Sequence, residues 1–401
     1  MKVAFVNTEY LPVPPTRGGA VEEWIDKIAN HLKGHEISVF SFDREAQGQS
    51  QTKDHVHYFW YRPGWLGKLL LSTYRLPFKK DDSKWLYFPY SFWCARMLKK
   101  IQADIIHIHN RPHFVWIIRK MNPRAKIILH LHQLSAFDEE DFWTKEFMAS
   151  VDLFVGCSHF IADELMKKYS VDKNKTSVFY NGLDLAEYPI LEKRAVVRSR
   201  LRQENDWTNK MVVLYVGRLV ENKGVHHLVQ AVRNLVLKGA TNLQLVVCGA
   251  RGYASREITP YIQKLYNTAY EVNENITFTG FVSHEKMLNY YAMADVVMIP
   301  SEVHEGFCLV TIEGMASGIP VAASNRGGMP EIVRDGKTGT IIGEPSVENI
   351  EKYLSDFLSQ PERFHKYIAV ARKSVEECFT WEKVSRTVED SYKELVAHAK
   401  G

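Results

Sequence analysis

Residues 298–333 of the chain are MIPSEVHEGFCLVTIEGMASGIPVAASNRGGMPEIV. The apolar run from Ala294 to Pro300 predicts a buried parallel strand that ends at the proline. The segment Glu305-Gly306-Phe307-Cys308 then turns into a helical pattern, with apolar side chains at Leu309, Val310, Ile312, Met315 and Ala316. Gly318 suits a left-handed C-terminal cap and Pro320 forbids a further turn, so the helix is expected to end there. A short strand and a new helix are then expected at 321–323 and 327–331.

The loop before this helix predicts a binding site for phosphate. The start of a helix exposes backbone N–H groups, which attract anions. Glu305 lies in the loop and Glu313 about two turns into the helix, so the two carboxylates are expected on one face, roughly 12 Å apart at a rise of 1.5 Å per residue. Such a site suits a ligand with hydroxyls at both ends and phosphate between them, which is the shape of a nucleotide sugar. The alternative is an ordinary strand, loop and helix with two surface glutamates.

The segment EGFCLVTIEGMASGIPVAAS, with two glutamates separated by seven residues, resembles the signature of the retaining glycosyltransferases of family four. The resemblance implies that Glu305 holds hydroxyls of the donor sugar and that Glu313 holds the ribose. It also implies donor contacts from the helix start, at Gly306, Phe307, Cys308, Leu309 and Val310. The family usually has glycine where this chain has Cys308. Because a backbone N–H touches the donor there, we expect the cysteine to be tolerated and to reshape the pocket.

A second motif follows the strand predicted at Met211–Val216, and it consists of Gly217-Arg218-Leu219 and then Glu221-Asn222-Lys223-Gly224. Arg218 can contact a diphosphate through two N–H groups at once, and Lys223 can do so as a point charge. A solvated basic turn is the alternative, but the spacing matches the GR…KG pattern of the resembled family. Gly249 opens another glycine-rich turn, and the resemblance implies that the backbone around Val282 receives the nucleotide base. We therefore predict that Gly217, Gly249 and Val282 also bind the donor.

In the first half, a strand at Lys2–Asn7 is followed by a loop that ends in Gly18 and Gly19, before a helix that begins near Ala20. Such glycines let the backbone approach a ligand closely, although most turns of this kind are structural. The fingerprint G-x-G-x-x-G of nicotinamide-binding folds is absent. In the resembled family this loop faces the donor phosphates and the acceptor. The opening LPVPPTRGGA is similar to that of bacterial members of the spore-coat protein SA type.

Histidines lie near the carboxyl ends of two predicted parallel strands, Ile105–His109 and Ile127–His132. Ligands of open α/β sheets bind outside those ends. His132 falls where the family has a histidine against the donor sugar, so we favour it as a catalytic residue. His109 and His130 can instead be core histidines bonded to backbone. Zinc ligation by the H-x-H pairs is a weaker alternative, because no third ligand is suggested nearby.

Between about His55 and Lys100, aromatic residues are interleaved with the basic residues Arg62, Lys68, Arg75, Lys79 and Lys80. Three interpretations stay open. The aromatic side chains can form a core that packs helices on the first sheet, with the lysines reaching outward. They can bind the acceptor by stacking on sugar rings. They can also rest, with the basic residues, on a membrane that holds a lipid-linked acceptor.

The composition is typical of a globular protein with two domains. The chain has 401 residues, of which 45% are hydrophobic and 24% charged, and this length is enough for two cores. A net charge of +4 argues for no polyanionic partner, so nucleic acid is not expected. The five scattered cysteines indicate reduced thiols in a cytosolic protein. We find no signal peptide and no apolar run that could span a bilayer, and we therefore expect a cytoplasmic protein that can contact the inner face of the membrane.

Strand and helix patterns alternate in both halves, which predicts two facing Rossmann-like domains with parallel sheets. The resemblance implies the GT-B fold, with the active site in the cleft between the domains. We expect an acceptor-side domain at 1–185 and a nucleotide-sugar domain at 186–379. In GT-B proteins the last helix commonly returns to the first domain, so we assign 380–401 there.

The expected reaction, which the resemblance implies, transfers a hexose of the glucose or N-acetylglucosamine type to a hydroxyl of a sugar or lipid-linked acceptor, with retention of configuration. The donor nucleotide is expected to be UDP, the commonest in the family, and the product a bacterial glycan, glycolipid or surface polysaccharide. Arg218, Lys223 and helix N–H groups would stabilise the leaving diphosphate, so no metal or other cofactor is expected. A sugar-nucleotide epimerase and a non-catalytic coat or scaffold protein are the alternatives.

Overall fold

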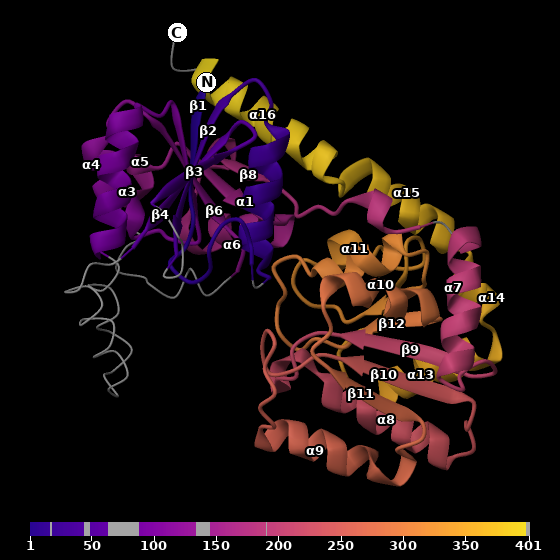
Figure 1. The fold of residues 1–401 in the computed structure, drawn as a ribbon. Helices are drawn as coiled ribbons and strands as arrows, with labels where there is room; N and C mark the ends of the chain where they lie inside the picture. Colours follow the sequence, from indigo (N-terminus) through magenta and orange to yellow (C-terminus); the bar gives the residue numbers. More distant parts are fainter. Residues whose placement is uncertain (17, 44–48, 63–87, 134–144, 190, 398–401) are drawn as a thin grey trace. The chain divides into compact units, whose positions relative to one another are not determined.

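The computed structural model describes the chain except residues 17, 44–48, 63–87, 134–144, 190 and 398–401. The chain forms two compact units, residues 1–181 with 381–401 and residues 182–380 (Figure 1). Each unit holds one sheet with helices packed on it. The first boundary follows Asn181, and Trp381 begins the part of the chain that rejoins the first unit.

The first sheet has the strand order β3-β4-β2-β1-β5-β6-β7-β8. Its neighbouring strands are parallel, except that β3 and β4 form an antiparallel pair at one edge. The strands are β1 (Lys2–Val6), β2 (Glu36–Phe42), β3 (Ser50–Lys53), β4 (Val56–Tyr61), β5 (Ile105–His109), β6 (Lys126–Leu131), β7 (Leu153–Gly156) and β8 (Thr176–Val178). The strand predicted at Ile127–His132 is confirmed as β6, but it ends one residue earlier, at Leu131.

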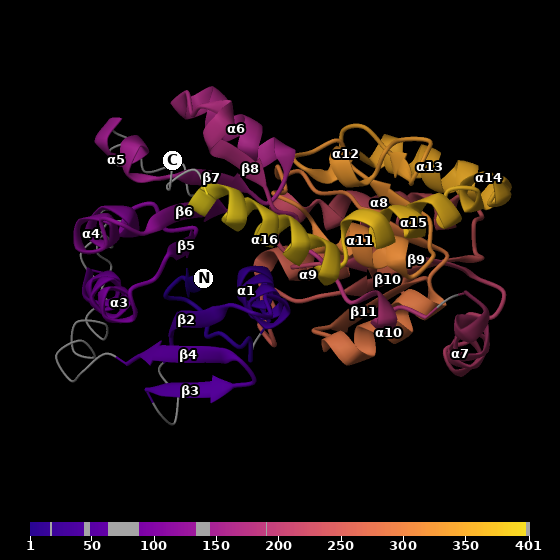
Figure 2. The same cartoon turned by 90° about the horizontal axis from the view of Figure 1, so that it is seen from above.

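Helices lie on both faces of the first sheet. Figures 1 and 2 show α3 and α4 on one face and α1 and α16 on the other. The helices of this unit are α1 (Ala20–His31), α3 (Phe88–Ile101), α4 (Phe114–Met121), α5 (Lys145–Ser150), α6 (His159–Tyr169), the 3-10 helix η4 (Lys173–Lys175) and α16 (Trp381–Ala397). Trp24 of α1 and Tyr392 of α16 are fully buried against the strands. The core of the first unit therefore includes the last helix, α16.

The second sheet has the order β11-β10-β9-β12-β13-β14, and all its strands are parallel. The strands are β9 (Met211–Val216), β10 (Leu243–Cys248), β11 (Ile276–Gly280), β12 (Val296–Ile299), β13 (Val321–Ala323) and β14 (Thr340–Ile341). Parallel strands buried on both faces require nearly continuous apolar runs, which is the pattern that predicted them. The order reverses between β9 and β12, which is the type of position where open α/β sheets bind ligands.

The described helices of the second unit are η5 (Leu185–Glu187), α7 (Leu191–Glu204), η6 (Glu221–Lys223), α8 (Val225–Leu237), α9 (Pro260–Ala269), η7 (Tyr270–Val272), α10 (His284–Met293), α11 (Leu309–Ala316), α12 (Met329–Ile332), α13 (Val347–Ser359), α14 (Glu362–His365) and α15 (Ile368–Cys378). Of these, α8, α9, η7, α13 and α14 bury one continuous apolar core with the strands of the sheet. The loops that follow β9, β10, β11 and β12 all leave the carboxyl edge of the sheet. Residues from four separate parts of the sequence are thereby collected at one edge.

The described aromatic residues of region 55–100 divide between core and surface. Tyr58 and Tyr90 are buried, whereas Phe88 and Phe92 on α3 are 45% and 42% exposed. The core interpretation therefore holds for the two tyrosines. Lys68, Arg75, Lys79 and Lys80 lie outside the described residues, and the two surface interpretations stay predictions.

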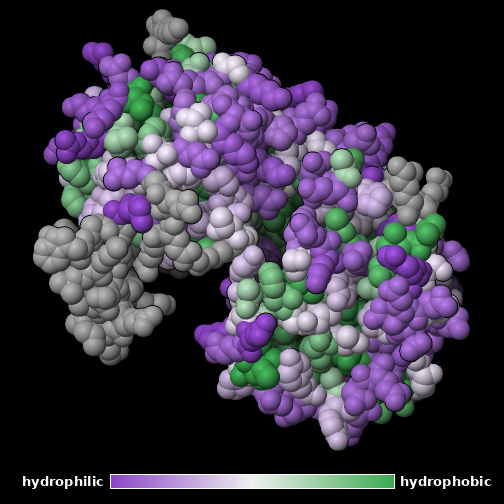
Figure 3. Space-filling view, in the orientation of Figure 1, coloured by the Kyte–Doolittle hydropathy of each residue, from purple (hydrophilic) through white to green (hydrophobic). Residues whose placement is uncertain are grey.

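Apolar side chains on the visible face form small separate groups in a mostly hydrophilic surface (Figure 3). No helix among the described residues is long enough and apolar enough to cross a bilayer.

Candidate active site

The loops at the carboxyl edge of the second sheet are joined by backbone hydrogen bonds. The Gly217 N–H donates to Cys248 O (3.0 Å), and the Gly249 N–H donates to Gly280 O (2.9 Å). A Cβ atom on Gly249 would lie 1.8 Å from Gly217 O, so this approach requires glycine at 249. The loops after β9, β10 and β11 thus form one connected backbone surface, on which Arg218 and Val282 lie.

Lys223 and Glu305 form an ion pair at this edge. Lys223 is the last residue of η6, Glu305 lies in the loop after β12, and the lysine Nζ contacts Glu305 Oε1. The hydroxyl of Ser301 donates to the same carboxylate oxygen (2.8 Å). The two charged side chains are only 20% and 15% exposed. Their pairing brings together two residues that the sequence placed 82 positions apart.

The loop that carries Glu305 is held by backbone contacts on two sides. On one side the N–H groups of Glu302 and Val303 both donate to Asn222 O (3.1 Å each). On the other side the Gly328 N–H donates to Glu305 O (2.8 Å). The loop is therefore fixed to η6 and to the segment before α12.

The helix after this loop begins later than the sequence predicted. It starts at Leu309, so Glu305 lies four residues before the helix and Glu313 only about one turn into it. The helical rise therefore does not set the separation of the two carboxylates, and the value of about 12 Å expected from it does not apply. The reason is Cys308, whose φ of +72° is left-handed and interrupts the helical geometry.

Cys308 is the N-cap of α11. The Thr311 N–H donates to its carbonyl oxygen (3.2 Å). Burial, followed by the negative charge of Glu305, raises the pKa of the thiol to about 12, while Lys223 lowers it. The thiol is therefore neutral at physiological pH, and Glu305, Lys223 and Glu313 all lie within electrostatic range of it.

Glu313 is positioned by a buried tyrosine that the sequence analysis did not identify. The hydroxyl of Tyr291 on α10 donates to Glu313 Oε2 (2.5 Å). Burial, and next the Glu313 carboxylate, raise the pKa of Tyr291 well above its usual range, so the hydroxyl remains a donor. Nothing in the spacing of Tyr291 distinguishes it from an ordinary core tyrosine.

Arg218 has an exposed side chain directly after β9. No ion pair to its guanidinium occurs within the part of the chain that the structure describes. Its backbone is held by Tyr215, whose hydroxyl donates to Arg218 O (3.1 Å). Burial raises the pKa of Tyr215 most; Glu305 raises it further, and Arg218 lowers it. Tyr215 therefore lies within electrostatic range of both the cation and the carboxylate.

The remaining predicted residues belong to the first unit. Gly18 and Gly19 have φ values of +74° and +123°, and a Cβ atom on Gly19 would lie 2.3 Å from Glu22 Oε2. His132 follows β6; its N–H donates to Asn110 Oδ1 (2.8 Å), and its Nε2 lies 3.0 Å from His109 Nδ1. The first contact holds the backbone of His132, and the second orients its ring.

His132 is one of four histidines that pack together on one face of the first sheet. The parallel register places His109 beside His130, and the rings of His130 and His132 lie 4.0 Å apart. His107 Nδ1 lies 2.6 Å from the hydroxyl of Tyr392. Five ring nitrogens of the group have no hydrogen-bond partner among the described residues. An unpartnered buried polar atom costs about 1–3 kcal/mol, and such costs are expected at functional sites more than in ordinary cores.

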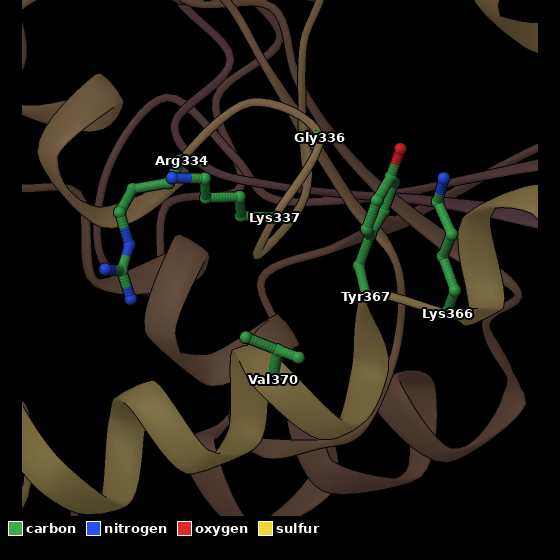
Figure 4. Close-up of a pocket in the computed structure, with 6 residues that line it drawn as sticks. All are labelled: Arg334, Gly336, Lys337, Lys366, Tyr367 and Val370. Carbon is green, nitrogen blue, oxygen red and sulfur yellow. The ribbon is translucent and has the colours of Figure 1, made fainter.

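A pocket of about 340 Å3 lies elsewhere on the second unit. It is lined by Arg334, Gly336, Lys337, Lys366, Tyr367 and Val370. Figure 4 shows the charged ends of Arg334 and Lys366 pointing in different directions. Residues 334–337 precede β14 and so lie at the amino edge of the parallel strands, opposite the candidate active site.

Two glycosyltransferase family models match the chain. Residues 21–187 match the family model "Glycosyltransferase Family 4", and residues 197–374 match "Glycosyl transferases group 1". Spore coat protein SA of Bacillus subtilis is 30% identical over 98% of this chain and 99% of its own length. Lipopolysaccharide 1,2-N-acetylglucosaminetransferase of Salmonella typhimurium is 29% identical over 98% of both.

The solved structure of Anabaena Alr3699/HepE in complex with UDP and glucose is similar in fold. Its TM-score is 0.73 at 20% identity, over 98% of this chain and 99% of that one. The two α/β sheets therefore form the GT-B fold, as predicted.

The left-handed backbone at Cys308 predicts that glycine is more stable than alanine at this position. A Cβ atom in that conformation costs about 1–2 kcal/mol, so the Cys308→Gly variant should exceed Cys308→Ala in free energy of unfolding by about 1 kcal/mol. Urea denaturation measures both. Lys373, exposed within α15, is the control, since Lys373→Ala should exceed Lys373→Gly by about 1 kcal/mol. A preference for alanine at both positions would contradict the left-handed geometry.

The four buried histidines predict a loss of stability in acid. Burial lowers the pKa of each ring, to about 3 for His132. Below pH 6.5 the unfolded chain therefore binds protons that the folded chain does not. The contribution of these rings to the free energy of unfolding should be complete above pH 6.5. It should be lost as the pH drops towards 3, by up to about 1.4 kcal/mol per pH unit for each ring.

Urea denaturation at pH 7.5, 6.5 and 5.5 tests this expectation. His130→Leu should make the free energy of unfolding less dependent on pH below 6.5. The slope should fall by about 1.4 kcal/mol per pH unit, which corresponds to about one proton. Ile128→Val, in the same strand, should lower stability without changing the slope. Equal slopes in all three proteins would show that His130 takes up a proton in the folded state.

Proposed function

Since this chain belongs to the glycosyltransferases of group 1 and family 4, we propose that it transfers a hexose from a UDP-linked donor to an acceptor hydroxyl with retention of configuration. The observation that carries the proposal is the Lys223–Glu305 pair at the carboxyl edge of the second sheet. It brings a cation suited to phosphate next to a carboxylate suited to sugar hydroxyls.

Arg218 and Lys223 bind the donor diphosphate in this proposal. Arg218 is exposed after β9, and Lys223 ends η6 at the same sheet edge. The N–H groups at the start of α11, from Phe307 to Val310, add partial positive charge. As the bond between the sugar C1 and the phosphate oxygen breaks, negative charge collects on the diphosphate. Donors fixed in advance stabilise that charge without rearrangement, which is an effective form of catalysis.

The two glutamates bind the ends of the donor. Glu305 accepts hydrogen bonds from hydroxyls of the hexose, and Glu313 accepts them from the ribose. Ser301 holds Glu305 (2.8 Å) and Tyr291 holds Glu313 (2.5 Å), so neither carboxylate has to be oriented by the substrate. Gly217, Gly249 and the backbone of Val282 form the rest of the donor surface. His132 contacts the donor sugar, and Gly18 and Gly19 face the donor phosphates and the acceptor.

The acceptor hydroxyl forms the new bond to C1 on the face from which the diphosphate leaves. Its proton passes to the departing phosphate oxygen. One carbon–oxygen bond forms and one breaks, and the protein supplies position and charge rather than a covalent intermediate.

Names of similar proteins support the choice of donor and product. Alr3699/HepE was solved with UDP and glucose, and the Salmonella protein is named as an N-acetylglucosaminetransferase that acts on lipopolysaccharide. We therefore propose UDP-glucose or UDP-N-acetylglucosamine as donor, and a bacterial glycan, glycolipid or surface polysaccharide as product.

Binding and product analysis test the function. We expect calorimetry to give tighter binding of UDP-glucose or UDP-N-acetylglucosamine than of GDP- or ADP-glucose. NMR of the product formed on an alkyl glycoside acceptor should show the anomeric configuration of the donor. Inverted configuration would refute retention, and an epimerised donor sugar formed without acceptor would favour an epimerase. The absence of binding of every nucleotide sugar would refute the transferase.

Substitution of the two cations tests their roles. Arg218→Ala and Lys223→Ala should each lower kcat by about 10²–10³-fold, because each removes a group that stabilises transition-state charge. Lys238→Ala is the control: this lysine lies next to the end of α8 and pairs with Glu351 (2.8 Å), so activity should be unchanged. Circular dichroism verifies folding of each variant. Full turnover in both cation variants would contradict the assignment.

A further inference from the structure

Two adjacent histidines at the start of α8 converge on one carboxylate. Nε2 of His227 lies 2.9 Å from Glu302 Oε1, and Nε2 of His226 lies 3.2 Å from the same oxygen. Glu302 lies in the loop after β12, held there by its N–H bond to Asn222 O (3.1 Å). Residues distant in sequence therefore present three potential metal-binding atoms to one small volume.

Two of the three distances between these atoms are close to those of a metal site, and all three atoms lie within 4.8 Å of one another. Around a tetrahedral zinc ion with bonds of 2.0–2.1 Å, ligand atoms lie about 3.4 Å from one another. The two nitrogen–oxygen distances of 2.9 and 3.2 Å need to open only slightly to match. Two histidines and a carboxylate are also a common ligand set for zinc, with the remaining position left to water.

Charge and access both favour a cation here. The side chains of His226, His227 and Glu302 are 27%, 24% and 37% exposed, so an ion can enter from solvent. Two carboxylates, Glu302 and Glu221, lie within electrostatic range of the His226 ring, and one lysine, Lys264, does so as well.

A supporting contact outside the three ligands is also present. The hydroxyl of Tyr261 on α9 lies 3.0 Å from Nδ1 of His226. When Nε2 binds a metal, the proton of the ring resides on Nδ1, and the tyrosine oxygen can accept it. Metal-bound histidines usually donate their second N–H to such a partner, which fixes the tautomer and the ring orientation.

The buried histidines of the first unit form the other candidate cluster, with ligand atoms of His107, His109 and His130 close together. They are fully buried, and within the described parts of the chain no carboxylate is among the groups that influence their pKa values. A divalent ion there would bring an uncompensated double charge into an apolar core, at a high cost in free energy. The comparison favours the site on α8.

We propose that His226, His227 and Glu302 bind a divalent transition-metal ion of the zinc type. His226 lies three residues after Lys223, and Glu302 lies three residues before Glu305. The ion would therefore tie the start of α8 to the loop that carries the proposed donor-binding carboxylate. Its role is structural: it stabilises these two segments and takes no part in the transfer reaction.

Metal titration of the full chain tests the proposal without measuring turnover. Protein treated with chelator and then dialysed is titrated with ZnCl2 by calorimetry and with CoCl2 by visible absorption. We expect one zinc ion per chain, a cobalt spectrum typical of nitrogen and oxygen ligands, and a Tm that rises with zinc concentration. His227→Ala and Glu302→Gln should each weaken binding by at least about tenfold and abolish the rise in Tm.

Two control variants locate the bound ion. His284→Ala removes a histidine that pairs with Glu187 (2.9 Å), and this variant should bind zinc like the wild type. His130→Leu should also bind normally; loss of binding in this variant would place the ion in the buried cluster and overturn the proposal. So would the absence of binding by the wild type, or unchanged binding by Glu302→Gln, which preserves the shape of the side chain. Circular dichroism in chelator verifies that His227→Ala is folded.

Discussion

The position of Glu305 depends on backbone contacts that only glycine permits. A Cβ atom on Gly224 would lie 1.8 Å from Pro300 O, and one on Gly327 would lie 2.1 Å from Glu305 O. Both glycines also have a positive φ, a backbone conformation that residues with a Cβ atom rarely adopt. Because Lys223 directly precedes Gly224, the same contact also sets the distance between the lysine and the carboxylate. Two uncharged residues thus determine where the charged pair lies.

This arrangement avoids an unpaired charge at each stage of the proposed reaction. Lys223 and Glu305 are mostly buried, and a single charge left in such surroundings is costly. Without substrate, each compensates the other. With a nucleotide sugar bound, the diphosphate can pair with the lysine while hydroxyls of the sugar donate to the carboxylate. Arg218 differs because it is exposed and hydrated. In the absence of ligand, its charge therefore needs no buried carboxylate to compensate it.

The fold could be predicted from the sequence because parallel strands buried on both faces leave long apolar runs, and because β-α alternation is visible along the chain. Two features of the site and one strand of the first sheet could not. The late start of α11 depends on the φ of Cys308, which no spacing reveals. The contact of Tyr291 with Glu313 depends on how α10 packs beside α11. The strand β3 is polar throughout and lacks the alternation that marks a half-buried strand.

The two histidine clusters show why a ligand set cannot be inferred from spacing alone. In the first unit the H-x-H pairs suggested no third ligand, yet the register of β5 and β6 places His130 beside His109. In the second unit the adjacent pair His226 and His227 has no spacing typical of a metal site, yet Glu302 meets both rings. The two clusters differ in that only the second includes a carboxylate, Glu302, among its described residues. A neutral imidazole tolerates burial but supplies no negative charge, so several together can form a polar core without holding an ion. One accessible carboxylate offsets part of the charge of a cation, and the smaller cluster is therefore the better site.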